Sequence, residues 1–130
     1  MVLIDSSPWI DLLSGNPAAE ARLLENWLRE GKPLATTGVV LQEVLQGART
    51  DREMNLLRNR LGRLPFLRAD KETHVEAARL HRKARARGWI VPAADALIAA
   101  TAVVHGVALL TTDAKHFRAL ARVSKLRLAR

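Results

Sequence analysis

The chain has 130 residues, no cysteine and a formal net charge of +8, and 48% of its residues are hydrophobic. This length and apolar content suffice to bury a core, so we expect a single domain over residues 1–130. Without cysteine there are no disulfides or thiolate metal sites, which agrees with a cytoplasmic protein. The longest uncharged stretch, residues 96–112, falls short of the ~20 apolar residues of a membrane span. The opening apolar run has no basic leader, so we expect no signal peptide and no membrane attachment.

Charge is distributed unevenly along the chain. Residues 1–76 contain 10 lysines and arginines and 11 acidic residues, whereas residues 77–130 contain 11 and two. The two acids of the basic half are Asp95 and Asp113. Such a positive surface favours a polyanionic partner, of which nucleic acid is the commonest in a cell. A solvated basic face that only aids solubility is the alternative.

The first predicted element is a short buried strand, Val2-Leu3-Ile4, which is followed by Asp5. Ser7-Pro8 is typical of a helix N-cap followed by a proline at the first helical position, so we expect a helix over residues 8–13. Asp5 is then left without a role at the end of a buried strand. A carboxylate there needs a partner, and no lysine or arginine is nearby in the sequence.

The rest of the chain alternates between predicted helices and strands, separated by glycine and proline. Helices are predicted from Asn16-Pro17 to Gly31, then over 38–48, 51–62, 70–87, 92–105 and 114–122. Strands are predicted over 33–37, weakly over 65–67, over 107–110, and as a possible edge strand over 126–128. This alternation indicates an α/β fold, with a mostly parallel sheet of four to five strands flanked by helices on both faces.

Two of these helices have distinctive surfaces. The helix over residues 70–87 has an inward row at spacings of three and four and an outward cationic face. The inward row is Thr73, Ala77, Leu80 and Ala84, and the outward face carries Arg79, Arg82, Lys83, Arg85 and Arg87. The helix over residues 92–105 is small and apolar on nearly every side, so it should be buried within the domain.

Four acidic residues stand at strand exits or on helix flanks that face the predicted core. They are Asp5, Glu43, Asp95 and Asp113. Each has an ordinary explanation, such as a helix cap, a dipole contact or a border residue that reaches solvent. Together they would repel one another unless a cation lay among them. Because ligands bind at the carboxyl ends of parallel strands, where Asp5 and Asp113 lie, a Mg²⁺ or Mn²⁺ ion fits this need.

Zinc is a weaker candidate because the four histidines form no pair at ligand spacing on one helix. These are His74, His81, His105 and His116. We interpret His81 as a flank residue and His105 as a helix-end residue. His116 is interpreted as a surface or hydrogen-bonding residue.

Four segments in this order resemble the PIN-domain ribonucleases, and the resemblance spans nearly the whole chain. They are Val-Leu-Ile-Asp5-Ser6-Ser7-Pro-Trp9-Ile, then Thr37 to Glu43-Val-Leu, then Pro92-Ala-Ala-Asp95-Ala-Leu-Ile-Ala-Ala-Thr-Ala, and Leu-Leu-Thr111-Thr-Asp113-Ala-Lys-His-Phe117. Within the family the chain is most similar to the VapC-type toxins of toxin–antitoxin pairs. The resemblance implies a single PIN-like domain that hydrolyses RNA with a Mg²⁺- or Mn²⁺-activated water and no protein nucleophile.

Roles follow from the resemblance residue by residue. Asp5, Glu43, Asp95 and Asp113 would form the catalytic metal site, with Ser6 and Thr111 as auxiliary hydroxyl residues. Cationic side chains beside the acids would hold RNA phosphates; the candidates are Arg79, Arg82, Lys83, Arg85 and Arg118. The implied partners are the RNA substrate, a VapB-type antitoxin and a second copy of the chain in a homodimer.

Other functions were weighed against this one. A phosphatase of the haloacid dehalogenase type needs a second acid two residues after the first, and position 7 is serine. A receiver domain needs an acidic pair ahead of a strand-end aspartate, and the spacing fails. The serious alternative is a nuclease-inactive PIN-like module that binds RNA or an antitoxin. The presence of all four acids argues against it, since a binding module has no use for a repulsive cluster.

Overall fold

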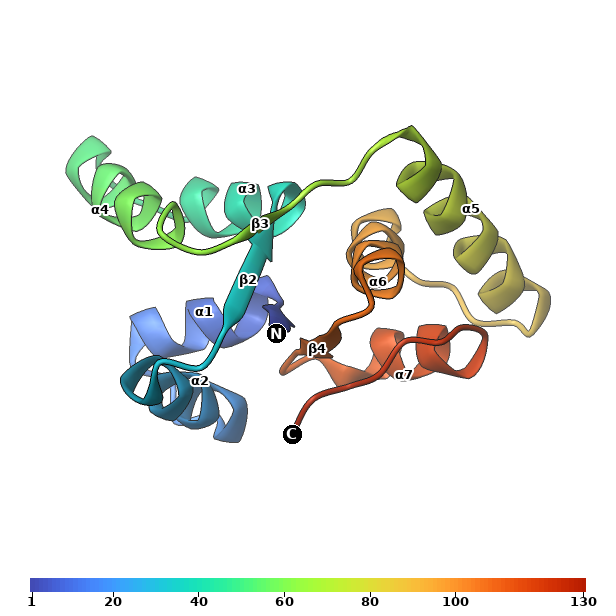
Figure 1. Cartoon of the computed structure of the whole chain (residues 1–130), viewed down its shortest axis with the longest axis horizontal. Coiled ribbons are helices and arrows are strands. Elements are labelled where there is room, and N and C mark those ends of the chain that lie inside the picture. The colour runs from blue at the N-terminus through green and yellow to red at the C-terminus, as the bar shows by residue number, and fades with distance from the viewer.

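The computed structural model describes residues 1–130 and has four short strands between two groups of helices (Figure 1). The strands are β1 (Val2–Ile4), β2 (Leu34–Thr37), β3 (Phe66–Leu67) and β4 (Ala108–Leu110). The helices are α1 (Ser6–Ser14), α2 (Ala19–Glu30), α3 (Gly38–Gln46), α4 (Asp51–Leu61), α5 (Lys71–Ala86), α6 (Ala93–His105) and α7 (Ala114–Arg122). In Figure 1, α2 and α4 lie to the left of the strands, α1 and α3 overlap β2 and β3 in the view, and α5 to α7 lie to the right. The predicted α/β class is confirmed.

The sheet has the order β3-β2-β1-β4, and all its pairings are parallel. Leu3 of the central strand β1 pairs with Ala35 on one side and with Leu109 on the other. Because the strands are parallel, their carboxyl ends lie at one edge. Asp5 therefore lies at the centre of that edge, beside the residues that follow β4.

The possible edge strand over residues 126–128 is reduced to one bridge between Leu109 and Leu128. Leu109 donates its N–H to the Arg127 carbonyl and accepts from the Ala129 N–H. In a strand of three residues, only the middle one directs its backbone groups away from β1. The outer edge of β4 therefore offers a single pairing position.

The start of α1 differs from the prediction. Ser7 is not the N-cap, because the helix begins at Ser6 and Asp5 is its cap, accepting a hydrogen bond from the Ser6 N–H at 2.8 Å. β1 ends at Ile4, so one residue alone separates strand from helix. Pro8 falls within the first turn, where its missing N–H leaves no partner unsatisfied. The other helices begin and end within about three residues of their predicted bounds.

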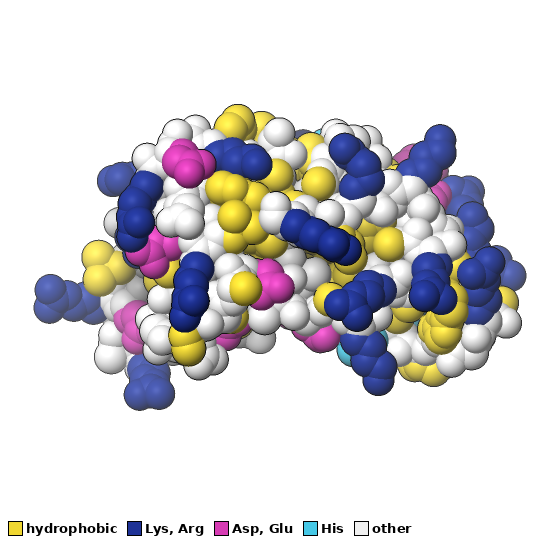
Figure 2. Space-filling view, turned by 90° about the horizontal axis from the view of Figure 1, so that it is seen from below, with side chains coloured by type: hydrophobic (Ala, Val, Ile, Leu, Met, Phe, Trp, Pro, Cys, Tyr) yellow, Lys and Arg dark blue, Asp and Glu magenta, His cyan; other side chains and the backbone are white.

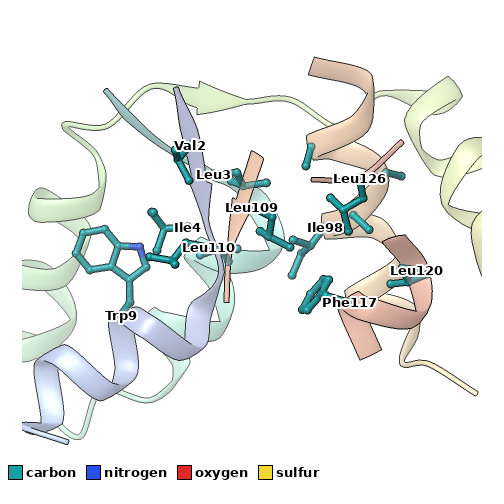
Figure 3. Packing of buried hydrophobic residues seen from close by; sticks show 14 of the residues in the cluster. Val2, Leu3, Ile4, Trp9, Ile98, Leu109, Leu110, Phe117, Leu120 and Leu126 are labelled. Atoms are coloured by element: carbon teal, nitrogen blue, oxygen red, sulfur yellow. The ribbon is translucent and has the colours of Figure 1, made fainter. Parts of the chain in front are cut away.

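Hydrophobic side chains cover both faces of the sheet (Figure 3). On one face, Trp9 of α1 lies against Ile4 and Leu110. On the opposite face, Leu109 points toward Ile98 of α6 and Phe117 of α7. All of these side chains are at most 1% exposed. The two halves of the core fix α1, α6 and α7 against the sheet, and α3 begins directly after β2 at the carboxyl edge.

Helix α6 is the most deeply buried helix, as its small apolar sequence predicts. Ala96 and the run from Ile98 to Ala102 are all buried. The predicted inward row of α5 is buried as well, and α5 and α6 pack against each other along their length. No helix of the protein is both long and apolar enough to cross a membrane.

Candidate active site

Asp5 is buried at the carboxyl end of β1 and is held by uncharged donors. Its side chain is part of a residue that is only 5% exposed. Oδ1 accepts the Ser6 N–H at 2.8 Å, and Oδ2 accepts the hydroxyls of Thr111 at 2.7 Å and Ser7 at 3.2 Å. Burial raises the pKa of Asp5, and these hydrogen bonds, that from Thr111 first, oppose the rise. The partners of Asp5 are therefore hydroxyl and amide groups.

Ser7 connects the exits of β1 and β4. Its hydroxyl donates to Asp5 Oδ2 and accepts the Thr112 N–H at 3.1 Å, so it is tied to the segment after β4. The Ser7 and Thr111 hydroxyls also lie 3.4 Å apart. Sequence reasoning gave Ser7 only a capping role. The serine two residues after a strand-end aspartate was the available signal.

Glu43 reaches the same region from α3. The Ser6 hydroxyl donates to Glu43 Oε1 at 3.2 Å and lies 3.5 Å from Asp5 Oδ1, so it stands between the two carboxylates. Burial raises the pKa of Glu43, and the negative charge of Asp5 raises it further. The predicted auxiliary residue Ser6 thus contacts two of the four acids, and Thr111 contacts one.

Asp95 lies in the first turn of α6 and is affected by every other acid of the set. Burial is the main cause that raises its pKa to about 6, and the charges of Asp5, Asp113 and Glu43 raise it as well. Of the causes, only His116 acts in the opposite direction through its charge. Charges act at this strength only over short distances. The four predicted acids therefore share one site at the carboxyl edge of the sheet.

Asp113 and His116 form the outer wall of the site. Asp113 precedes α7 but its side chain makes no capping hydrogen bond, so helix capping does not explain this acid. Its side chain is 60% exposed. His116 Nδ1 lies 3.3 Å from Asp95 Oδ2 and 3.6 Å from Asp113 Oδ2. The sequence predicts His116 to be a surface or hydrogen-bonding residue; its side chain is 29% exposed, and the sequence does not indicate that it lies against two of the acids.

The donor set of this site fits a hard divalent cation. The ligand atoms of Asp95, Asp113 and His116 all lie within 4.8 Å of one another. His116 Nδ1 is shielded from solvent and makes no hydrogen bond, despite its short distances to both carboxylates. Carboxylate oxygens suit Mg²⁺ and Mn²⁺. The site therefore offers acids that repel one another and a buried nitrogen without a donor or acceptor partner.

Comparison with known proteins places this geometry in a family. The PIN domain family matches residues 2–123. The chain belongs to the PIN-domain family. It is 34% identical over 134 residues to ribonuclease VapC11 of Mycobacterium tuberculosis, covering 99% of this chain and 98% of that one. It is also 34% identical over 117 residues to ribonuclease VapC19 of the same organism, covering 90% and 92%. The predicted resemblance to VapC-type PIN domains is confirmed.

Solved structures have the same fold. A DNA-bound VapBC complex from Salmonella typhimurium contains a chain that matches with a TM-score of 0.80 and 19% identity, over 98% of this PIN domain and 96% of that chain. VapC20 of Mycobacterium tuberculosis, described as a sarcin–ricin loop cleaving toxin, matches with a TM-score of 0.69 and 16% identity over 92% and 95%. At these identities the likeness shows the fold alone.

The predicted RNA-binding residues of this PIN domain do not form one patch. Arg82 and Arg85 line a hollow of about 650 Å³ between α5 and the start of α6, close to Asp95 in sequence. Lys83 lines a different hollow of about 710 Å³, between α5 and the residues after α7. Arg118 lines a third, and Arg79 pairs with Glu76 at 3.2 Å. The cations therefore surround the α5–α7 half of the molecule.

Proposed function

We propose that this VapC-type PIN domain is a metal-dependent endoribonuclease that acts as the toxin of a toxin–antitoxin pair. Its substrate is RNA, its cofactor is Mg²⁺ or Mn²⁺, and Asp5, Glu43, Asp95 and Asp113 are its catalytic residues. The observation that carries the proposal is the pKa of Asp95, which burial and the charges of the other three acids together raise to about 6. Such mutual repulsion is a cost unless a cation is bound.

Each group of side chains has its own role in the proposed reaction. The four carboxylates would hold the cation, with Asp5 oriented by Thr111 and Ser7 and Glu43 oriented by Ser6. A bound divalent cation supplies the Lewis acidity that activates a water and offsets the charge of the phosphodiester during cleavage. The basic residues around α5 and α7 would offset the repulsion between RNA phosphates and the acids. In this proposal the nucleophile is a water molecule, and no protein side chain attacks the phosphorus.

The partner in this proposal is a VapB-type antitoxin. Relatives of the same fold have been solved as VapBC complexes from Salmonella typhimurium and Rickettsia felis. The positive charge of the α5–α7 half would suit an acidic antitoxin segment as well as RNA. A homodimer and a cytoplasmic location complete the proposal, since its RNA substrates would be met there. The nuclease-inactive module remains the alternative, and nothing in the geometry favours it.

Cleavage under controlled metal conditions tests the proposal. The purified chain should cut RNA with Mg²⁺ or Mn²⁺ and should be inactive in chelator. Asp5→Asn and Asp95→Asn should each lower the rate by about 10³-fold or more, because both remove a ligand whose charge the reaction needs. Thermal unfolding checks that each variant is folded.

Asp51→Asn provides the matched control. Asp51 is an exposed acid in the first turn of α4 and contacts none of the four carboxylates, so its substitution should leave cleavage unchanged. Activity that persists in chelator, or in a folded Asp95→Asn protein, would contradict the mechanism. RNA binding without cleavage under any metal condition would favour the nuclease-inactive module.

A further inference from the structure

A groove lies between the α5–α6 loop and α7, beside the acid cluster. Its volume is about 520 Å³, and its wall includes Trp89, Ile90, Lys115, His116, Arg118 and Arg122. None of its lining residues is acidic. This volume falls within the range of about 300–1,000 Å³ that small ligands occupy. The groove therefore combines an aromatic ring, a large aliphatic side chain and three cations.

Trp89 is fixed at the mouth of this groove by the end of α5. Gly88 has φ +81°, a left-handed conformation that reverses the chain after the helix. The Gly88 N–H then donates to the Arg85 carbonyl at 2.9 Å, and the Trp89 N–H donates to the Ala84 carbonyl at 3.0 Å. These bonds hold the backbone of Trp89 in place. Its ring is partly exposed, whereas Trp9 and Trp27 are only 1% and 6% exposed.

Cations lie along one side of the groove and over the tryptophan. The guanidinium carbons of Arg87 and Arg122 lie 5.5 Å and 5.8 Å from the centre of the Trp89 ring. Lys115, Arg118 and Arg122 follow one another at intervals of three and four residues, so they share one face of α7. Figure 2 shows lysine and arginine side chains gathered, with hydrophobic ones between them, at the end of the molecule that α5, α6 and α7 form in Figure 1.

The groove leads directly to the acid cluster through one residue. His116 contributes to its wall, and the Nδ1 atom of the same ring lies 3.3 Å from Asp95 Oδ2. A chain lying in the groove therefore has its next unit beside the carboxylates. This contact with the acids through His116 distinguishes the groove from the hollow that Lys83 lines, whose wall does not include His116.

We propose that this groove is a subsite for an unpaired RNA nucleotide next to the bond that is cut, with its base stacked on Trp89. Lys115, Arg118 and Arg122 contact the phosphates of that nucleotide and its neighbour. An aromatic ring beside cations is the arrangement with which proteins hold single-stranded RNA. The inference rests on the proposed function and deepens it by assigning a base-stacking residue. Because a base inside a duplex is stacked between its neighbours, only an unpaired base can lie on Trp89.

Intrinsic tryptophan fluorescence tests the subsite without catalysis. The wild-type protein is titrated in chelator with a short single-stranded RNA, with the same RNA annealed to its complement, and with polyglutamate. Since Trp9 and Trp27 are buried, quenching reports on Trp89. Single-stranded RNA should quench, and the duplex should quench far less. Because the variants at position 89 lack this reporter, their affinity is measured by the anisotropy of a dye-labelled single-stranded RNA. Trp89→Ala should weaken single-strand binding roughly 5- to 150-fold, the range of one base–aromatic stack, and Trp89→Phe should weaken it less.

Matched variants separate this subsite from a general effect. Phe66→Ala removes another exposed aromatic, 52% exposed on β3, and should leave RNA affinity unchanged. Asp95→Asn should still bind and quench, at least as tightly as the wild type because it removes a negative charge beside the groove. Cleavage is lost in this variant, so the subsite is tested apart from the proposed function. In cleavage assays, folded Trp89→Ala should raise KM with little change in kcat.

Three results would overturn the inference. Equal quenching by duplex and single strand would remove the preference for an unpaired base. Polyglutamate that quenches as strongly and competes with RNA would assign the groove to an acidic protein segment. An unchanged KM and affinity in folded Trp89→Ala would remove Trp89 from the RNA path while leaving the nuclease proposal intact.

Discussion

Asp5 and Asp95 lie in the same acid cluster, but the protein accommodates their charges by different means. Asp5 accepts hydrogen bonds from the Ser7 and Thr111 hydroxyls and from a backbone N–H. Asp95, in the outer half, accepts no hydrogen bond from a hydroxyl or a backbone N–H, and its Oδ2 lies 3.3 Å from His116 Nδ1. Hydroxyl donors act at any pH, whereas an imidazole offsets charge only when it is protonated.

Because of this difference, hydrogen bonds fix one half of the site, whereas the other half responds to pH, cations and salt. The strand-end half, with Asp5 and Glu43, is held in place by neutral groups on α1 and the segment after β4. The helix half, with Asp95 and Asp113, depends on the charges around it. We therefore expect substitutions in the first half to act through hydrogen bonds, and those in the second to act through pH, cations and salt.

The largest effect on stability should follow loss of the Thr111 hydroxyl. Thr111→Val leaves the buried Asp5 carboxylate without its shortest hydrogen bond, 2.7 Å, and should lower the free energy of unfolding by about 1.5–3 kcal/mol at pH 7. The loss should shrink at acidic pH, because a protonated Asp5 no longer depends on that donor. Urea denaturation at several pH values measures it.

Thr112→Val is the matched control for this substitution. The Thr112 Oγ1 is buried but has no hydrogen-bond partner, so its removal should cost little or should stabilise the fold. Equal losses in the two variants would show that the volume and backbone of this segment, rather than the bond to Asp5, determine the stability.

The register of β1 and β4 explains why a correctly predicted sheet is enough to predict the contact between Asp5 and Thr111. Ile4 pairs with Leu110, so the residues that follow them are neighbours. The order and type of the elements came from local patterns, such as the inward row of α5. Predicting that the four acids converge required both the parallel sheet and the family resemblance. No spacing within one helix or strand places Glu43 near Asp95.

Two features of the site could not be predicted, because they depend on how the chain turns. Ser7-Pro8 carries a strong local capping signal, yet β1 and α1 are separated by Asp5 alone, so the aspartate caps the helix with Oδ1 and faces the site with Oδ2. His116 looks like the other histidines in the sequence. Only the turn between β4 and α7 brings its ring to Asp95.

A smaller effect, and one that depends on pH, should follow Asp95→Asn in metal-free protein. The folded-state pKa of Asp95 is raised from 3.8 to about 6, so between these values the folded state binds more protons than the unfolded state. Wild-type stability must then fall as pH rises through that window. The variant avoids this loss: it should be as stable as the wild type below pH ~4 and more stable above pH ~6.

The pKa values set an upper limit of about 3 kcal/mol on this gain, and screening by solvent reduces the expected value to about 1–2 kcal/mol. Added Mg²⁺ or Mn²⁺ should raise the melting temperature of the wild type but hardly that of Asp95→Asn, because binding to the folded state stabilises it. Asp113→Asn should change stability less, since its side chain is 60% exposed. A gain that is independent of pH would contradict the electrostatic explanation.

The smallest effect should come from the cations around the helix half. Arg82 and Lys83 are neighbours on α5 but line different hollows, and only that of Arg82 reaches Ala93 and Ala94, just before Asp95. Replacing both by alanine should weaken RNA binding and flatten its salt dependence by about 0.7 in log–log slope per lost phosphate contact. Arg52→Ala on α4 should leave the slope unchanged. Comparing the single variants then shows which hollow the RNA follows. A change in the salt slope of Arg82→Ala alone would place the RNA backbone beside Asp95. An unchanged salt slope in the double variant would exclude α5 from the RNA path.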